Sequence, residues 1–294
     1  MFVQANTVRA VKVYFKERLK DLFSEREIKQ IFNQGLAKRL QLSDSELLLA
    51  DELRLSESDL LYLRSIVKRL QQNEPLQYIL GDTYFYGLQI LCDQRALIPR
   101  PETEELVDWI LEDVAKQVWQ IKQVLDVCTG TGCIALALKS KWGDATIHAL
   151  DFSTDALALA ILNSQQLKLD ILPVHADALK SPADWSFAAE SFDLWVSNPP
   201  YIPNRDKQAM EANVLEFEPG MALFVPDEDP LLFYRSIAHA AAVYLKKGAY
   251  LYFELHADFA DETAAMLHEL GWINTTIRQD MQGKNRMLRT QKAG

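Results

Sequence analysis

An alternation of strand-like and helix-like segments over residues 123–270 most constrains the fold of this chain. Short apolar runs are followed by longer segments with apolar residues at helical spacing. Because parallel strands need long crossovers, usually helices, this alternation predicts an α/β fold with a mostly parallel sheet covered on both faces. The predicted strands are 124–127, 146–150, 172–175, 192–196 and 249–255, and the predicted helices are 103–117, 134–139, 154–166, 231–246 and 259–270.

The first 75 residues differ in character and predict a small helical bundle. Apolar residues recur at helical spacing over 8–22 and 60–70. Two Ser-x-x-Glu patterns, starting at Ser24 and Ser43, are capping boxes that open two further helices. The bundle contains no catalytic constellation, and a structural cap and a docking module for a macromolecule are both open interpretations.

A change of composition separates the bundle from the α/β segment. Residues 84–90 are rich in β-forming residues and contain Gly87, which predicts a hairpin. We therefore expect three parts. They are a helical domain over 1–75, a β-hairpin linker over 76–98 and a catalytic domain over 99–294.

Composition excludes several classes of protein. The chain is 49% hydrophobic and 24% charged, which is typical of a globular protein with a sizeable core. No apolar run approaches the ~20 residues of a membrane span, and the start of the chain lacks the apolar centre of a signal peptide. Cys92, Cys128 and Cys133 lack metal-ligand spacing. We expect a cytoplasmic protein with reduced thiols, no metal site and no membrane partner.

Charge is unevenly distributed along the chain. Of a net charge of −10, residues 1–75 contribute +2, from 13 Lys and Arg against 11 Asp and Glu, and the remainder contributes −12. Phosphate contacts dominate nucleic-acid affinity, so an acidic main domain argues against broad binding of nucleic acid. A local basic groove stays open.

A glycine-containing loop follows the first predicted strand, at Asp126-Val127-Cys128-Thr129-Gly130-Thr131-Gly132. Gly130 and Gly132 let the backbone approach a ligand closely. Asp151 ends the second predicted strand, nineteen residues after Gly132, where a carboxylate typically binds ribose hydroxyls. A loop, a following helix and an acidic residue at this spacing predict a nucleoside cofactor.

The residues of the loop favour one cofactor over others. The loop lacks both the G-x-G-x-x-G pattern of dinucleotide sites and the Gly-Lys-Ser/Thr of a P-loop. Asp126 would repel a pyrophosphate and attract an ammonium or sulfonium group. We therefore expect S-adenosylmethionine rather than NAD. Asp177, after the third predicted strand, is either a neighbour of the adenine or a turn residue.

The turn Asn198-Pro199-Pro200-Tyr201 ends the fourth predicted strand, at the edge where ligands of open α/β sheets bind. Asn198 offers a side-chain carbonyl, and Pro199 a backbone carbonyl without a competing N–H. Two acceptors and an aromatic ring on a stiff turn suit a planar NH2 group. The turn therefore predicts chemistry on an amide or amino nitrogen, with Asn198, Pro199 and Tyr201 as catalytic candidates.

These features together resemble the release factor glutamine methyltransferases, the PrmC/HemK family of protein-(glutamine-N5) methyltransferases. The resemblance covers nearly the whole chain. Its motifs are an interdomain signature at 74–81, a proline loop at 98–104, the Asn-Pro-Pro-Tyr turn and a segment at 216–219. Adenine-N6 methyltransferases of nucleic acids share the Asn-Pro-Pro-Tyr turn, so the proline loop and the helical domain are the more specific signals.

The resemblance implies a class I methyltransferase fold with a seven-stranded sheet. It implies methyl transfer to the glutamine of the Gly-Gly-Gln motif in peptide chain release factors, with S-adenosylhomocysteine as product and an effect on translation termination. The helical domain would dock the release factor, and we expect a monomer with no direct nucleic-acid partner.

Two sets of site residues are predicted on these grounds. Arg100 and Glu102 either contact the substrate protein, order the proline loop or form a surface ion pair, and Glu218 braces the active-site loop. The predicted substrate contacts are Arg100, Glu102, Asn198, Pro199, Pro200 and Tyr201. The predicted cofactor contacts are Asp126, Cys128, Thr129, Gly130, Thr131, Gly132, Asp151, Asp177, Ala178 and Asn198.

Two residues depart from the family pattern. Cys128 stands where the first of three glycines is usual, and we expect the loop to tolerate it because a thiol is small. Ala178 stands where many relatives have an aromatic residue beside the adenine. Three alternatives stay open: a ribosomal protein glutamine methyltransferase, an adenine-N6 methyltransferase, which would need base flipping, and a non-catalytic cofactor-binding protein.

Overall fold

The computed structural model describes residues 5–117, 119–180 and 185–294. The chain folds as two compact units, residues 1–81 with 211–217 and residues 82–210 with 218–294. The break after Gly81 lies between the boundaries expected at residues 75 and 98. Gly81 ends a short helix with a φ of 82°, a left-handed conformation that glycine adopts without strain.

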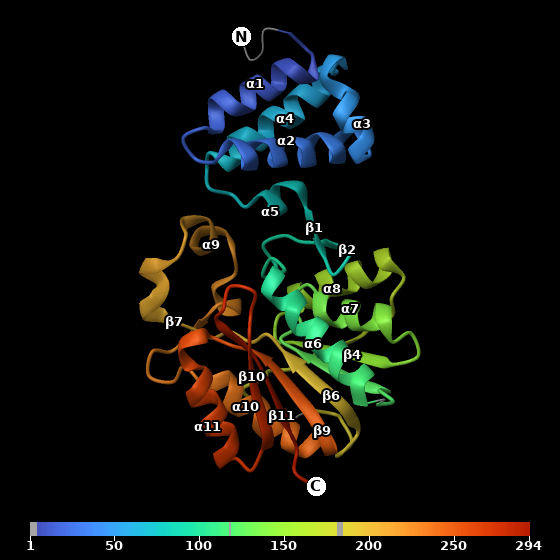
Figure 1. The fold of residues 1–294 in the computed structure, drawn as a ribbon, viewed down its shortest axis with the longest axis vertical. Coiled ribbons are helices and arrows are strands. Elements are labelled where there is room, and N and C mark those ends of the chain that lie inside the picture. The colour runs from blue at the N-terminus through green and yellow to red at the C-terminus, as the bar shows by residue number, and fades with distance from the viewer. Residues whose placement is uncertain (1–4, 118, 181–184) are drawn as a thin grey trace. The chain divides into compact units, whose positions relative to one another are not determined.

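The first unit is helical, as expected, and its amino-terminal helices run from blue to cyan in Figure 1. The predicted capping boxes at Ser24 and Ser43 are confirmed, and a third box at Ser56 uses an aspartate. Leu22 and Leu61, expected in the apolar stripes, are instead more than half exposed. The elements are α1 (Val8–Leu19), α2 (Glu25–Leu40), α3 (Asp44–Leu49), the 3-10 helix η1 (Ala50–Glu52), α4 (Glu57–Leu70), α5 (Leu76–Leu80) and, later in the chain, α9 (Ala212–Phe217).

The second unit contains a seven-stranded sheet in the order β10-β11-β9-β6-β3-β4-β5. Its strands run parallel except for β11, which is antiparallel to both neighbours. The sheet strands are β3 (Gln123–Val127), β4 (Thr146–Asp151), β5 (Leu172–His175), β6 (Phe192–Ser197), β9 (Leu245–Glu254), β10 (Ile273–Gln279) and β11 (Asn285–Gln291).

Helices cover both faces of this sheet, because successive strand residues point to opposite sides. Val124 and Tyr252 share one core with α6 (Pro101–Gln117), α7 (Cys133–Lys141) and part of α8 (Thr154–Leu167). The next residues along these strands, such as Leu125 and Phe253, share the other core with α10 (Leu232–Tyr244) and α11 (Ala260–Glu269). Figure 1 shows the two helical layers.

Smaller elements complete the second unit. The predicted hairpin is present, with two residues of positive φ, Tyr86 and Gly87, between its strands. The remaining elements are β1 (Asp82–Phe85), β2 (Leu88–Leu91), β7 (Ile202–Pro203), β8 (Phe224–Val225) and the 3-10 helices η3 (Asn204–Ala209), η4 (Gly220–Ala222) and η5 (Ala257–Phe259).

Three features of the structure differ from what the residue patterns indicated. The pattern of residues did not predict β10 and β11, because β10 is largely exposed and lacks an apolar run. Helix α6 begins at Pro101, two residues earlier than expected, since proline suits the first turn of a helix. Helix α10 ends at Tyr244 and β9 takes over at Leu245. None of the helices in the described ranges is long and apolar enough to span a membrane.

Candidate active site at the carboxyl ends of the sheet

A cavity of about 250 Å³ opens where β3, β4 and β6 end. Strands β4 and β5 lie on one side of β3 in the sheet, and β6 and the later strands lie on the other. The strand order therefore reverses at β3, and open α/β sheets bind ligands at such a switch point. Of the fifteen predicted site residues, ten line the cavity. They are Arg100, Cys128, Thr129, Gly130, Thr131, Asp151, Asp177, Ala178, Asn198 and Pro200.

The loop between β3 and α7 has an unusual backbone. Cys128, Gly130 and Gly132 all have positive φ values, of 61°, 55° and 80°. A Cβ atom on Gly132 would lie 3.1 Å from the Cβ atom of Ala160 in α8, so this position also needs a small residue. The small size of the thiol was the reason for expecting the loop to tolerate Cys128. The structure shows that the constraint at this position is instead the left-handed backbone.

Asp126 lies at the end of β3, fully buried beneath this loop. Its Oδ2 atom accepts hydrogen bonds from the Thr129 hydroxyl at 2.6 Å and from the Ala135 amide at 3.2 Å. Within the described residues, Asp126 Oδ1 has no partner, and neither has the buried Thr131 hydroxyl. Burial raises the pKa of Asp126 to about 7. An unpaired buried carboxylate oxygen fits a ligand that brings positive charge.

Asp151 ends β4 on the far side of the loop. One of its oxygens accepts from the Gly130 amide and the other from the Ser153 amide, both at 2.9 Å. Burial raises the pKa of Asp151, while these amides oppose the shift. The carboxylate keeps acceptor capacity for a hydroxyl group, as a ribose would need.

The adenine side of the predicted site contains an aromatic residue that the sequence did not indicate. Ala178 is buried, and Phe152, directly after Asp151, lines the cavity with 56% of its surface exposed. Asp177 also lines the cavity, and its Oδ1 atom accepts from the Leu179 amide at 2.9 Å, so it is a turn residue as well. Phe152 is an aromatic residue of the cavity wall, whereas the position of Ala178 has none.

The proline loop is held by one buried carboxylate. Glu218 accepts from the Ile98 amide at 3.1 Å and from the Arg100 guanidinium at 2.5 Å. The Glu218 side chain is 1% exposed and that of Arg100 33%. Arg100 is thus held in an ion pair at the cavity wall. Glu102 does not line the cavity and instead lies 3.4 Å from the Gln282 amide nitrogen.

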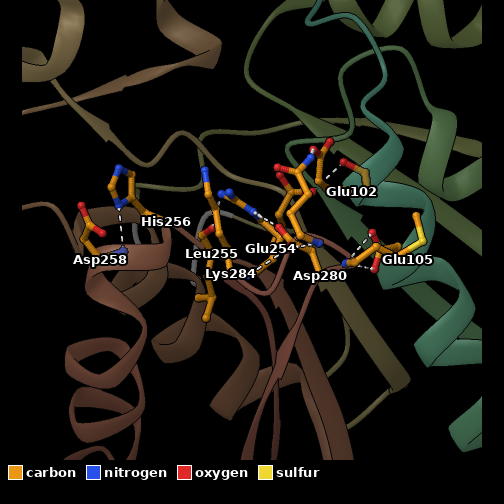
Figure 2. Close-up of polar contacts among 12 residues, drawn as sticks. Glu102, Glu105, Glu254, Leu255, His256, Asp258, Asp280 and Lys284 are labelled. Carbon is orange, nitrogen blue, oxygen red and sulfur yellow. Dashed lines mark hydrogen bonds and ion pairs between the residues drawn. The ribbon is translucent and has the colours of Figure 1, made fainter. Parts of the chain in front are cut away.

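A chain of hydrogen bonds links Asn198 to the end of β9. Asn198 Nδ2 donates to the Thr103 hydroxyl at 3.2 Å, and Thr103 donates to Glu254 Oε2 at 2.5 Å. The Tyr201 hydroxyl donates to Glu254 Oε1 at 2.9 Å. Burial raises the pKa of Glu254, and the two hydroxyl groups and Arg286 oppose this shift. Figure 2 shows Glu254 at the end of β9, together with Glu102 and Glu105 of α6.

Residue patterns alone did not indicate Thr103, Phe152 or Glu254. Glu254 is the last residue of a parallel strand, so the rule that ligands bind at carboxyl ends was an available signal. Asp126, Gly132, Pro199 and Tyr201 do not line the cavity, although each directly adjoins residues that do or holds them in place. Their predicted roles stay predictions.

Comparison with known proteins is consistent with this geometry. A family model described as "PrmC N-terminal domain" matches residues 15–81, and one described as "Methyltransferase domain" matches residues 124–217. A release factor glutamine methyltransferase of Flavobacterium psychrophilum is 38% identical over 96% of this chain and 98% of that protein. Its counterpart in Bacteroides thetaiotaomicron is 36% identical over 95% and 98%.

The chain belongs to the release factor glutamine methyltransferase family. Solved structures support the fold of this family member. The catalytic domain of hMettl16, solved in complex with the MAT2A 3'UTR hairpin 6, has a TM-score of 0.52 at 15% identity, and the match covers 81% of this chain and 82% of that domain. A 16S rRNA methyltransferase of T. thermophilus, solved with AdoMet and guanosine, has a TM-score of 0.50 at 16% identity and covers 72% and 49%. The fold is that of a class I methyltransferase.

Proposed function

We propose that this protein transfers a methyl group from S-adenosylmethionine to the side-chain amide nitrogen of the glutamine in the Gly-Gly-Gln motif of peptide chain release factors. The observation that carries the proposal is the orientation of Asn198. Its amide nitrogen is used by Thr103, so its carbonyl oxygen is available to accept from a substrate NH2 group. The names of the relatives support the choice of release factors.

The residues around the cavity fit S-adenosylmethionine. Asp126, with an unpaired buried oxygen, would hold the positive end, and Asp151 the ribose hydroxyls. Phe152 and Leu179 line the cavity as apolar neighbours for the adenine. When bound, this cosubstrate supplies an electrophilic methyl group.

The protein's contribution to the reaction is positioning. An amide nitrogen is a weak nucleophile, because its lone pair is delocalised into the carbonyl. Asn198 Oδ1 and the Pro199 carbonyl accept the two N–H bonds, which fixes the direction of the nitrogen lone pair. Tyr201 packs against the amide and excludes water. Positioning of this kind contributes up to about 7–11 kcal/mol to lowering a barrier.

The first unit is proposed to dock the release factor, in a monomeric cytoplasmic enzyme that needs no nucleic acid or membrane. Two findings support docking. The family model for the amino-terminal domain covers most of this unit, and Leu48 and Leu49 of α3 expose 82% and 86% of their surfaces. Exposed leucines side by side are typical of protein contacts.

Methyl transfer from labelled S-adenosylmethionine to a purified release factor tests the proposal. A factor with Gly-Gly-Ala in place of Gly-Gly-Gln is the control. Label on the intact factor alone is the expected result. Label on both factors, or transfer only to ribosomal protein or to DNA, would contradict it and assign the activity to one of the alternatives.

A further inference from the structure

The arrangement of donors around Glu254 has a consequence for Asn198. A hydroxyl group has a single proton, and that of Thr103 is directed to Glu254 at 2.5 Å, the length of a charge-assisted hydrogen bond. The Thr103 oxygen therefore accepts the hydrogen bond from Asn198 through a lone pair. Only the NH2 group of Asn198 can donate to that lone pair, which leaves its carbonyl oxygen for the substrate.

Among the described residues, only the hydrogen bond to Thr103 fixes the orientation of the Asn198 amide. The two ends of an amide have nearly the same shape, so a 180° turn exchanges oxygen for nitrogen at little steric cost. No donor within residues 5–117, 119–180 and 185–294 binds Asn198 Oδ1. A turned Asn198 would present NH2 to the NH2 group of a glutamine, where neither could accept.

Glu254 is suited to impose the orientation because both of its oxygens accept. Thr103 donates to one and Tyr201 to the other, so a single carboxylate, 2% exposed, anchors two of the elements that surround the substrate amide. Thr103 lies on α6, Tyr201 follows β6, and Glu254 ends β9. Strands β6 and β9 are paired, with Ser197 opposite Phe253. This register places Glu254, the next residue of β9, near the turn that follows β6.

We propose that Glu254 is a positioning residue, which through Thr103 and Tyr201 fixes the direction in which Asn198 presents its carbonyl oxygen to the substrate amide. It does not contact the reacting atoms. The inference rests on the proposed function of the site and adds the group that sets its acceptor. It follows that Asn198 and Glu254 act together, although they come from different strands.

Kinetics of Glu254→Leu and Thr103→Val test the inference. Glu254→Leu leaves the Thr103 proton without a carboxylate and free to turn Asn198, and Thr103→Val removes the hydroxyl at nearly constant shape. We expect kcat to fall about 10²-fold in each, a loss typical of misplaced reactants. The KM for the release factor and the Kd for S-adenosylhomocysteine should change less than about threefold, because the amide contact is a small part of either surface.

Two comparisons separate orientation from general damage. Thr103→Ser keeps the hydroxyl, and it should recover at least about tenfold of the kcat lost in Thr103→Val. Glu105→Gln is the matched control. Glu105 lies on the same helix and is labelled in Figure 2. Its carboxylate accepts from the Met281 amide and has no hydrogen bond to Thr103 or Tyr201, both of which the structure describes, so its loss should leave kcat unchanged.

A substrate analogue reports on the orientation directly. A release factor with Gly-Gly-Glu presents a carboxylate, which the Asn198 carbonyl repels and a turned NH2 group would bind. Its inhibition constant, relative to the KM for the native factor, should fall in Thr103→Val and Glu254→Leu. Unchanged inhibition, kcat within threefold of the wild type, or equal losses of kcat and S-adenosylhomocysteine affinity would overturn the inference. Failure of the wild-type enzyme to methylate the factor would instead refute the proposed function.

Discussion

Asn198 illustrates how a single side chain depends on its surroundings. The residue follows β6 and lines the cavity, and its amide nitrogen is bound to Thr103. A short polar residue at this point is a strong signal in the sequence. The atom that it offers to a ligand is decided by a neighbour 95 residues away.

Replacing Asn198 by alanine should separate chemistry from cofactor binding. The change removes the acceptor that holds the substrate nitrogen, and we expect kcat to fall about 10²- to 10³-fold, the range for loss of one preorganised group. The Kd for S-adenosylmethionine should change far less. Steady-state kinetics and calorimetry measure the two effects, and equal losses in both would rule out the assigned role.

Asp126 should make cofactor binding dependent on pH. Burial raises its pKa to about 7, and a bound cation favours its charged form. The affinity for S-adenosylmethionine should therefore rise as pH increases through about 7 and then level off. Calorimetric titration over this range tests the expectation, and Asp126→Asn should bind more weakly with a flatter profile.

Stability should change with pH in the opposite sense. The pKa of Asp126 in the folded protein lies above the 3.8 of an ordinary aspartate. Between these values the folded state binds more protons than the unfolded chain, so the contribution of Asp126 to the free energy of unfolding falls as pH rises and is constant above about 7. Urea unfolding of the wild type and Asp126→Asn would isolate this contribution, and identical pH profiles would contradict it.

Cys128 has a left-handed backbone with a φ of 61°, which costs a residue with a side chain about 1–2 kcal/mol. Glycine avoids this cost but orders a freer chain, at about 0.5–1 kcal/mol. We expect Cys128→Gly to be more stable than Cys128→Ala by up to about 1 kcal/mol in urea unfolding. Cys128→Ala is the matched control, because it removes the thiol and keeps the strain. A glycine variant less stable than the alanine variant would show that the cost of ordering the freer chain exceeds the cost of the left-handed backbone.

At the scale of elements, connections between segments distant in sequence shape the site. The proline loop and the segment after α9 meet at Glu218, and α6, the turn after β6 and the end of β9 meet at Glu254. The β3–α7 loop is tied to α8 and to the hairpin by Asn163, which bonds the Thr131 carbonyl and both backbone groups of Leu91. Fully bonded buried side chains of this kind hold an otherwise irregular loop in one conformation.

Removal of the Glu218 side chain should loosen the proline loop. Glu218→Ala leaves the Ile98 amide and the Arg100 guanidinium without their acceptor, and we expect a loss of about 2–3 kcal/mol in the free energy of unfolding. Glu216→Ala, on an exposed residue of the same segment, should change it by less than about 0.5 kcal/mol. Urea unfolding measures both, and equal stabilities of the two variants would argue against the bracing role.

At the scale of the whole molecule, charge separates the two ends of the sequence. The first 75 residues have a net charge of +2 and the remainder −12. We expect labelled duplex DNA to receive no methyl group and to bind no more tightly than about 10⁻⁴ M at moderate salt, because phosphate contacts require a cationic surface. Fluorescence anisotropy measures the binding of the labelled DNA. Tight, salt-sensitive binding would favour an adenine-N6 methyltransferase.

Much of the architecture could be predicted from local patterns. All four expected amino-terminal helices and most of the α/β elements follow from spacing over a few residues, as at the capping boxes of Ser24 and Ser43. The strands β10 and β11 were predictable only through the family resemblance. The mostly exposed β10 owes its place to pairing with β11 rather than to an apolar pattern of its own.

The fold class, the glycine loop and the Asn-Pro-Pro-Tyr turn could be predicted from the residues alone, because each depends on backbone geometry and on neighbours within one or two turns. Three further features depend on how the chain packs. They are the free atom of Asn198, the raised pKa of Asp126 and the hydrogen bond between Thr103 and Glu254, which are 151 residues apart. The direction of a hydrogen bond and the burial of a side chain depend on all the neighbours that sheet register and helix packing bring together. No local pattern contains them, since the same segment would give a different site against different partners.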